Sequence, residues 1–253
     1  MNTLLNEEAL VRALAAAGLS APVRWDGVTA STNATALALA ADGAPAWTLV
    51  GAGHQTAGRG RQGRTWVDRP GAALMCSLVL RPDWEPDRVG LVSLAAGATM
   101  AEAASDVSAV QVRCKWPNDL LVDGAKVGGI LGEVVASADG IEHVVVGIGV
   151  NLEAPDGVPG AGAIGPVDEE NLLVGFLERL RSLMEQEPAA IVDRWRSVSA
   201  TLGRRVAATT VSGRVAHGVA TDLDETGALL VESEAGRVRV AFGEIEHLET
   251  SPP

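Results

Sequence analysis

Three arginines and three glycines alternate within one short stretch of the chain, Gly58-Arg59-Gly60-Arg61-Gln62-Gly63-Arg64. Each arginine carries a planar fork of donors that suits carboxylates and phosphates. Glycine lets a backbone adopt conformations closed to other residues and lets a ligand approach it closely. The chain as a whole has a formal net charge of -12 at pH 7, so this basic cluster differs from its acidic background. The pattern predicts a loop that closes over an anion.

Arginine–glycine runs also occur in disordered tails and in nucleic-acid-binding arms. This run instead lies between two apolar segments, residues 47–52 and 72–80, which both read as buried strands. A loop carried by two core strands is a usual place for a functional site. Non-specific DNA binding needs a basic face, so the acidic net charge predicts that nucleic acid is not a partner.

A second cluster contains Lys115-Trp116-Pro117-Asn118-Asp119, followed by Lys126 and then by Gly128-Gly129-Ile130-Leu131. The small residues after Lys126 leave room for a ligand beside its amine. On these residues alone, Lys126 is equally a solvated lysine just past a hairpin turn. Pro117 alone supports no more than a turn at a strand end.

Other polar residues have both a structural and a functional interpretation. Ser31-Thr32-Asn33 stands at a predicted helix start, where capping accounts for it. Gln55 precedes the arginine run as a loop side chain, and Asn151 ends an apolar strand, where it can cap a loop. The four histidines are His54, His143, His217 and His247. They are too scattered in the sequence for a metal site or a nucleophile–base pair.

Composition limits the class of protein. Hydrophobic residues make up 47% and charged residues 21%, the balance of an ordinary globular protein. Cys76 and Cys114 lie in apolar surroundings without a CxxC pair, so we expect buried free thiols in a reducing compartment. The N-terminus lacks a signal-peptide pattern, and Glu102 and Asp106 interrupt the longest apolar stretch. We therefore predict a cytoplasmic protein without a membrane partner.

The periodicity predicts an α+β fold. Helices are expected over residues 6–17, 34–41 and 88–107, after residue 168 and after Pro188, with strands at 23–28 and 110–114. Turn signals at 123–124 and 139–140 separate three further strands, the last ending at Asn151, and residues 153–166 read as a loop. From residue 203 only short strands follow, at 205–211, 213–222, 229–233 and 237–241. We predict two domains, 1–202 and 203–253, the second a small β-barrel.

These motifs, in this order and at these spacings, resemble the biotin–protein ligases. The resemblance runs from about Ser31 to the C-terminal strands, and the arginine loop and the block from Lys115 to Ile130 are its most specific parts. It implies a biotin–lipoate ligase catalytic domain similar to the class II synthetases. In such a domain helices flank a mixed, largely antiparallel sheet, and an SH3-like β-barrel follows. Because little chain precedes Ser31, we expect a ligase-only form without the winged helix-turn-helix of family members that act as repressors.

The resemblance implies a two-step reaction. The biotin carboxylate attacks the α-phosphorus of ATP, with Mg²⁺ accompanying ATP, and biotinyl-5'-AMP and pyrophosphate form. A lysine of a biotin carboxyl carrier domain of a biotin-dependent carboxylase then takes the biotin, and AMP leaves. Two alternatives stay open: a lipoate or octanoate ligase or transferase of the same fold, and a non-catalytic biotin-sensing regulatory module.

The resemblance also implies roles for individual residues. Lys126 is expected to contact the biotin carboxylate and the α-phosphate, Asn118 to place Mg²⁺ or phosphate, and Asp119 to orient Lys115 or the incoming carrier lysine. Trp66 could cover the site, but we expect a core position at the start of a strand. The implied catalytic residues are Lys126, Arg61, Asn118 and Asp119. The implied biotin-binding residues are Ser31, Thr32, Asn33, Gln55, Gly58, Arg59, Gly60, Arg61, Lys126, Gly128 and Gly129. The implied ATP-binding residues are Arg61, Arg64, Lys126, Asn118 and Asn151.

One departure from the family concerns the adenine. Family members stack a tryptophan from the segment after Asn151 on this base, but residues 153–168 contain no aromatic residue. Asn151 matches the position that reads the adenine edge. We expect aliphatic groups such as Val158 or Ile164 to pack on the base, or the base to stay partly open.

Overall fold

A seven-stranded sheet forms the centre of the larger part of the molecule, in the order β1-β2-β3-β7-β6-β5-β4. The computed structural model describes residues 5–137, 140–210, 213, 215–241 and 243–248. β1 and β2 pair in parallel, and the other neighbours pair antiparallel. The strands are β1 (Val23–Asp26), β2 (Leu49–Ala52), β3 (Ala73–Leu80), β4 (Arg113–Lys115), β5 (Asp119–Val122), β6 (Ala125–Ser137) and β7 (Gly140–Asn151). The predicted mixed, largely antiparallel sheet is confirmed.

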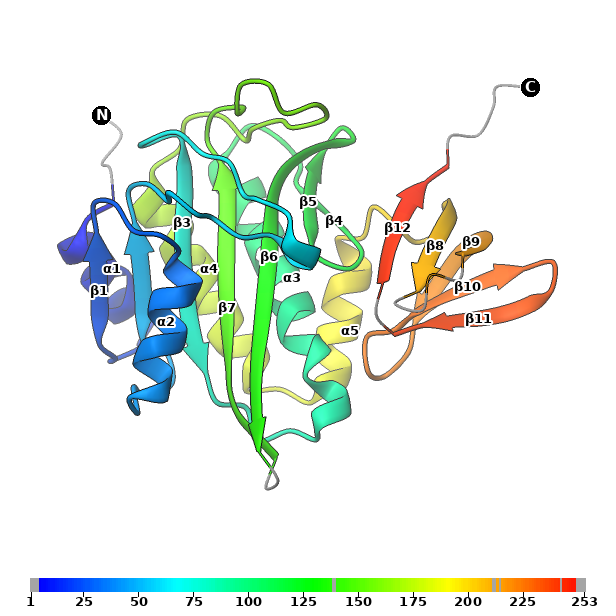
Figure 1. The fold of residues 1–253 in the computed structure, drawn as a ribbon, viewed down its shortest axis with the longest axis horizontal. Coiled ribbons are helices and arrows are strands. Elements are labelled where there is room, and N and C mark those ends of the chain that lie inside the picture. Colours follow the sequence, from blue (N-terminus) through cyan, green and yellow to red (C-terminus); the bar gives the residue numbers. More distant parts are fainter. Residues whose placement is uncertain (1–4, 138–139, 211–212, 214, 242, 249–253) are drawn as a thin grey trace.

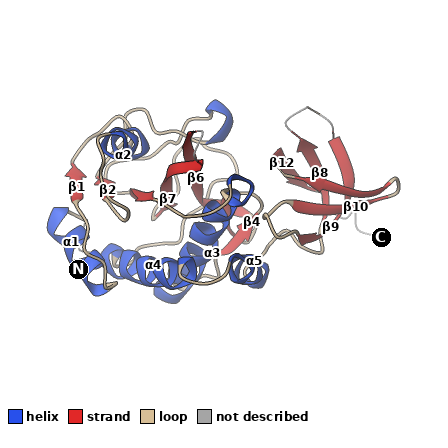
Figure 2. Ribbon diagram, turned by 90° about the horizontal axis from the view of Figure 1, so that it is seen from below, coloured by secondary structure: helices blue, strands red, loops and turns tan. Residues whose placement is uncertain are grey.

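Helices cover both faces of this sheet (Figures 1 and 2). α2 (Thr32–Ala41) packs on β2, β3 and β7 from one side. The other side carries α1 (Glu7–Ala16), α3 (Gly90–Val107), α4 (Glu169–Met184) and α5 (Pro188–Ser197). Short 3-10 turns occur at Arg61–Gly63 and Pro86–Arg88. No helix in the described ranges is both long and apolar enough to cross a membrane.

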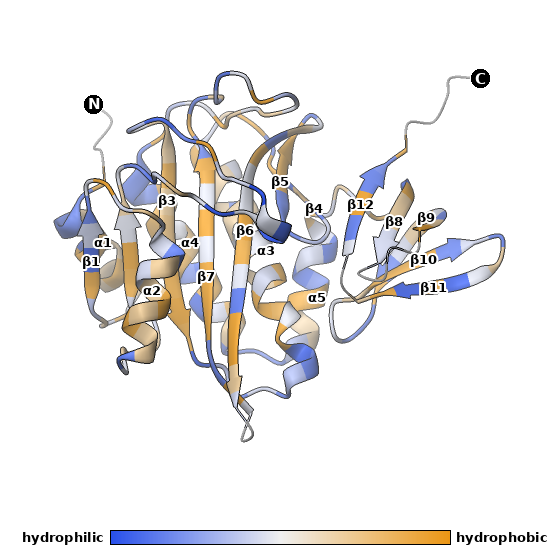
Figure 3. Ribbon diagram, viewed as in Figure 1, coloured by the Kyte–Doolittle hydropathy of each residue, from blue (hydrophilic) through white to orange (hydrophobic). Residues whose placement is uncertain are grey.

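Local sequence signals set the helix starts. The Asn6 side chain accepts a hydrogen bond from the backbone N–H of Ala9 at 2.9 Å, and Asp168 accepts one from Asn171 at 2.9 Å. Both are N-cap contacts, and acidic residues follow them in the first turn, where the helix dipole favours negative charge. α3 is apolar on nearly all sides because it lies between the sheet and the helices α4 and α5. Figure 3 shows the apolar residues concentrated along the central strands.

The C-terminal part is a separate five-stranded antiparallel sheet in the order β11-β10-β9-β8-β12. Its strands are β8 (Arg205–Thr210), β9 (Val215–Leu223), β10 (Leu229–Ser233), β11 (Gly236–Val240) and β12 (Gly243–His247). The predicted C-terminal β domain is thus present, and β12 is a strand that the sequence analysis missed. The predicted turn at 139–140 and the meeting point of the strands predicted at 205–211 and 213–222 fall partly outside the described residues.

Candidate active site

The arginine run forms a hairpin, which we call the arginine hairpin and define as residues 58–66. The Trp66 N–H donates to the Gly58 carbonyl at 3.0 Å, and the Gly60 N–H donates to the Arg64 carbonyl at 2.7 Å. At its tip Gln62 and Gly63 have φ of 55° and 73°, the left-handed conformation of a tight two-residue hairpin turn. The hairpin crosses the face of the sheet in front of β7 and β6 (Figure 1). The predicted loop therefore has the conformation of a short two-stranded ribbon.

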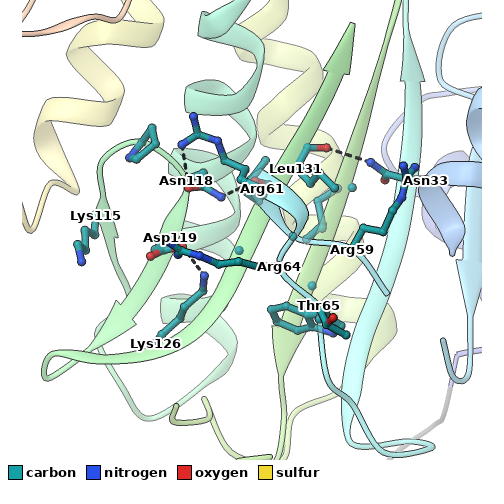
Figure 4. Close-up of a pocket in the computed structure, with 18 of the residues that line it drawn as sticks. Asn33, Arg59, Arg61, Arg64, Thr65, Lys115, Asn118, Asp119, Lys126 and Leu131 are labelled. Carbon is teal, nitrogen blue, oxygen red and sulfur yellow. Dashed lines mark hydrogen bonds and ion pairs between the residues drawn. The ribbon is translucent and has the colours of Figure 1, made fainter. Parts of the chain in front are cut away.

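A cavity of about 230 Å³ lies between this hairpin and the sheet (Figure 4). Most of the predicted site residues line it, namely Ser31, Thr32, Asn33, Gln55, Arg59, Gly60, Arg61, Arg64, Asn118, Asp119, Lys126 and Gly129. The other three, Gly58, Gly128 and Asn151, lie outside its lining. Segments that are far apart in the sequence thus meet around one space.

One end of the cavity has a buried polar floor. Ser31, Thr32 and Asn33 are at most 4% exposed. The Gln55 Oε1 atom accepts hydrogen bonds from the backbone N–H of Thr32 at 2.8 Å and from its hydroxyl at 3.2 Å. Gln55 thereby caps α2, whereas Ser31, the N-cap residue by position, makes no side-chain capping bond. The capping interpretation of Ser31 therefore finds no side-chain hydrogen bond to support it, and Gln55, expected as a loop side chain, makes the capping contact instead.

The floor continues through Ser77 into the hairpin. The Ser77 hydroxyl lies 2.8 Å from the Thr32 hydroxyl and 2.6 Å from Asn33 Oδ1. Asn33 Nδ2 donates to a Glu133 carboxylate oxygen at 2.8 Å, and the same oxygen accepts from Arg59 at 2.9 Å. A continuous network therefore runs from the helix start to the arginine hairpin. Ser77 and Glu133 were not singled out in the sequence, where nothing local marks them.

Glycines in β7 make room for the floor. A side chain at Gly147 would place its Cβ 2.1 Å from Asn33 Oδ1, and one at Gly149 would lie 2.7 Å from the Trp66 ring. Trp66 lines the cavity, and its indole N–H is buried without a hydrogen-bond partner among the described residues. The assignment of Trp66 to the core was wrong, because the space that admits its ring depends on a glycine in a distant strand.

The cations at the other end of the cavity differ in their partners. Lys126 lies 2.5 Å from the Asp119 carboxylate, and Arg64 pairs with Glu244. Asp119 thus pairs with Lys126, and Lys115 extends away from this pair (Figure 4). Arg61 makes no ion pair with any carboxylate in the part of the chain that is described, and it donates to Asn118 Oδ1 at 3.4 Å. Burial lowers the pKa of the Arg61 guanidinium, an effect that the charges of Glu244 and Asp119 oppose.

The loop after β7 is anchored along the backbone of Lys126. The Lys126 N–H donates to the Gly160 carbonyl at 2.8 Å, and the Gly162 N–H donates to the Lys126 carbonyl at 2.8 Å. The buried Asn151 amide donates to the Gly162 carbonyl at 3.0 Å, which is the loop-capping arrangement. Ile164 is buried in the core and Val158 is exposed, and both lie outside the cavity lining. The adenine contacts of these three residues stay a prediction.

The C-terminal sheet closes one side of the cavity. Glu244 and Ile245 of β12 belong to its lining, and the Gly243 carbonyl accepts a hydrogen bond from Arg61 at 3.3 Å. The Trp116 backbone N–H donates to the Thr201 hydroxyl at 3.0 Å, and its indole N–H donates to the Gly227 carbonyl at 3.1 Å. The sequence analysis missed these contributions, although the alternation in Gly243–His247 could have indicated a strand.

Comparisons with known proteins agree with this architecture. Residues 27–151 match the family model "Biotin/lipoate A/B protein ligase family", and residues 201–248 match "Biotin protein ligase C terminal domain". A biotin–[acetyl-CoA-carboxylase] ligase of Paracoccus denitrificans is 36% identical, over 86% of this chain and 97% of the relative. The chain belongs to the biotin protein ligase family.

Other members of the biotin protein ligase family are similar over most of the chain. The biotin–[acetyl-CoA-carboxylase] ligase of Mycobacterium tuberculosis is 35% identical, over 87% of this chain and 86% of the relative. Among solved structures, the biotin protein ligase from Aquifex aeolicus in complex with biotin and ATP has a TM-score of 0.73. It is 26% identical and covers 90% of this chain and 99% of its own. The similarity therefore includes both sheets that border the cavity.

Proposed function

We propose that this protein activates biotin with ATP to biotinyl-5'-AMP and then transfers biotin to one lysine of a biotin carboxyl carrier domain. The observation that carries the proposal is the two-ended cavity. Its polar floor consists of the buried Thr32 and Asn33 and the half-buried Gln55, and Arg61 and Lys126 provide cations at the other end. Biotin has the matching shape, with a polar ureido ring at one end and a carboxylate at the other. Membership of the biotin protein ligase family supports the same activity.

The polar floor binds the ureido ring. The backbone N–H and the hydroxyl of Thr32 both donate to the Gln55 amide oxygen, so the two side chains hold each other in place. A site built from buried hydrogen-bonding groups discriminates strongly against ligands that cannot pair with them. The apolar rings of lipoate and the chain of octanoate leave these groups unpaired. The floor therefore favours biotin over the lipoate alternative.

In the first step a biotin carboxylate oxygen bonds to the α-phosphorus of ATP, and the bond from that phosphorus to the pyrophosphate oxygen breaks. The two reactants are anions, so cations must hold them in line. Arg61 suits this role because its hydrogen bonds in the described structure go to the neutral oxygens of Asn118 and Gly243 and not to a carboxylate. Lys126 is paired with Asp119 in the structure. It contacts the biotin carboxylate and the α-phosphate by leaving Asp119 for these substrate anions.

In the second step the neutral amine of a carrier lysine attacks the carbonyl carbon of the mixed anhydride, and AMP leaves. Once the phosphate holds Lys126, the Asp119 carboxylate is free to orient the incoming amine. Lys126 and Asp119 therefore both act in the reaction, Lys126 on the substrate anions and Asp119 on the carrier lysine.

The phosphate end also fits a magnesium ion carried in with ATP. Its oxygen donors are the Asp119 carboxylate and the Asn118 amide oxygen. One carboxylate together with substrate phosphates is a common ligand set for Mg²⁺. When bound in the first step, the ion would neutralise phosphate charge, and Asn118 and Asp119 would hold it; in the second step Asp119 serves the amine.

The domain boundary and the location belong to the same proposal. We place the boundary after residue 202, between α5 and β8. A cytoplasmic location is supported by Cys76 and Cys114, which are buried free thiols. Burial raises the pKa of Cys76 to about 12, so its thiol stays protonated.

The test is a labelling assay with purified protein, ATP, Mg²⁺ and a biotin carboxyl carrier domain. Biotin should drive pyrophosphate release and add one biotin to one lysine of the carrier. Lipoate and octanoate should react at least about tenfold more slowly, because unpaired buried polar groups cost about 1–3 kcal/mol each. Equal turnover of lipoate would contradict the biotin assignment.

A further inference from the structure

His54 and Asp68 meet at the base of the arginine hairpin, outside the cavity lining. The His54 Nδ1 atom lies 2.8 Å from Asp68 Oδ2. His54 directly precedes Gln55, and Asp68 follows Trp66 by two residues. The pair therefore joins the segment that leads into the hairpin to the segment that leaves it. The sequence analysis found no role for His54 and did not single out Asp68.

The surroundings of Asp68 are unusual for a purely structural carboxylate. Its side chain is 0% exposed, whereas that of His54 is 26% exposed. Its Oδ1 atom has no hydrogen-bond partner among the described residues. Its Oδ2 atom accepts from both His54 and the backbone N–H of Gln55, the latter at 3.4 Å. Burying a carboxylate with one unpaired oxygen is costly, so a functional reason for this group deserves a test.

The contacts of Asp68 lead directly to the polar floor. Asp68 holds the backbone of Gln55, and the Gln55 side chain holds Thr32 through its Oε1 atom. The Gln55 Nε2 atom donates to the Met75 sulfur at 3.4 Å, so both ends of its amide are engaged. A shift at the hairpin base therefore moves Gln55 relative to Thr32, and it also moves Gly58 and Trp66, which pair across the hairpin.

We infer that His54 and Asp68 are positioning residues for biotin binding. They fix the Gln55 side chain and the base of the arginine hairpin and do not contact the substrate. The inference rests on the proposed function, since it concerns the biotin end of that site. Their loss should weaken biotin binding and leave the phosphate end intact.

The kinetic test compares Asp68→Ala and His54→Ala with the parent protein. Each should raise the KM for biotin about tenfold, the equivalent of one charge-assisted hydrogen bond. The KM for ATP and the single-turnover rate at saturating biotin should stay within about threefold, the pattern of lost ground-state binding. Asp68→Asn keeps an acceptor at the same place and should restore the KM to within about threefold. The double variant should be no worse than Asp68→Ala, since the two residues act as one unit.

A control and a second readout separate positioning from general damage. Glu170→Gln removes a carboxylate from the exposed Arg12 pair and should leave the KM for biotin at the parent value. Amide hydrogen exchange of residues 56–66 in the ligand-free protein should speed up in both alanine variants and not in Glu170→Gln. If Asp68→Ala does not fold, His54→Ala and Asp68→Asn decide the matter by the same measurements.

Two outcomes overturn the inference: a parent-like KM for biotin in folded His54→Ala, or unchanged exchange of the hairpin amides. Failure of the proposed function looks different. The parent protein itself would then release no pyrophosphate with biotin, while the exchange experiment would still report whether the pair anchors the hairpin.

Discussion

The Arg61 guanidinium donates a hydrogen bond to the backbone carbonyl of Gly243, 182 positions further along the chain, at 3.3 Å. The contact joins the arginine hairpin of the large sheet to β12 of the C-terminal sheet. Both oxygen partners of Arg61, Gly243 and Asn118, are neutral. An arginine held by neutral acceptors at a cavity wall keeps its charge available for an anion.

Arg61→Gly should still form biotinyl-AMP but release it early. The adenylate phosphate loses a charge-assisted hydrogen bond of about 1.5–3 kcal/mol, so escape should be at least about tenfold faster. The measurement is a chase of bound adenylate into solution, together with labelling of bystander amines. Arg237→Gly, which removes an exposed arginine from β11, is the control and should retain adenylate like the parent. Equal retention in Arg61→Gly would mean that other groups hold the intermediate.

Lys126→Ala should lose at least about tenfold in single-turnover adenylate formation at saturating substrates, because charge that develops between carboxylate and phosphate loses its cation. The two lysines of the chain allow a matched comparison. Lys115 also lines the cavity but extends away from the Asp119–Lys126 pair, so Lys115→Ala should lose less than about threefold. A parent-like rate in Lys126→Ala would reduce Lys126 to a surface lysine and refute its catalytic assignment.

The sequence predicted what depends on local signals. Asn6 and Asp168 mark their helix starts by their own side chains, and the motif residues from Ser31 to Lys126 meet in one cavity. It did not predict the carboxylate partners of the cations. Glu133 and Glu244 reach Arg59 and Arg64 only through tertiary packing over 74 and 180 positions. Trp66 was misassigned for a related reason. Its ring packs against Gly149 of β7, a distant strand where a larger side chain would collide with it. β12 was missed although its residues alternate, because it pairs with β8 at the other end of the C-terminal segment and not with its neighbour in sequence.

Glu244→Gln should lower the KM for ATP about two- to fivefold. The Arg64 side chain is paired with Glu244, and an exposed pair of this kind contributes up to about 1 kcal/mol that a phosphate contact of Arg64 must replace. Glu246→Gln changes the same strand two residues away, on an exposed side chain, and should leave the KM unchanged. Steady-state kinetics at fixed biotin make the comparison. A higher KM in Glu244→Gln would show instead that Glu244 holds the arginine hairpin in its productive position.

The last prediction concerns pH and two neighbouring carboxyl groups at the start of α4. Burial, with a smaller effect from Asp168, raises the pKa of Glu169 from 4.5 to about 7. The Arg12 hydrogen bond lowers the pKa of Glu170. A raised carboxyl pKa means that the folded state binds the proton more tightly than the unfolded state. Its contribution to stability is therefore present at low pH and is lost as the pH rises from about 4.5 to about 7.

Glu169→Gln mimics the protonated acid at every pH, so it should raise the free energy of unfolding at about pH 8 by on the order of 1–3 kcal/mol. At about pH 4 it should change little, because the parent Glu169 is mostly protonated there in both the folded and the unfolded state. Glu170→Gln should have the opposite effect at about pH 8, where the parent carboxylate is ionised and paired with Arg12. Urea unfolding of the parent and both variants at the two pH values measures these differences. If Glu169→Gln gives the same change in unfolding free energy at both, the parent Glu169 ionises in the folded protein without cost, and the stated effect of burial is wrong.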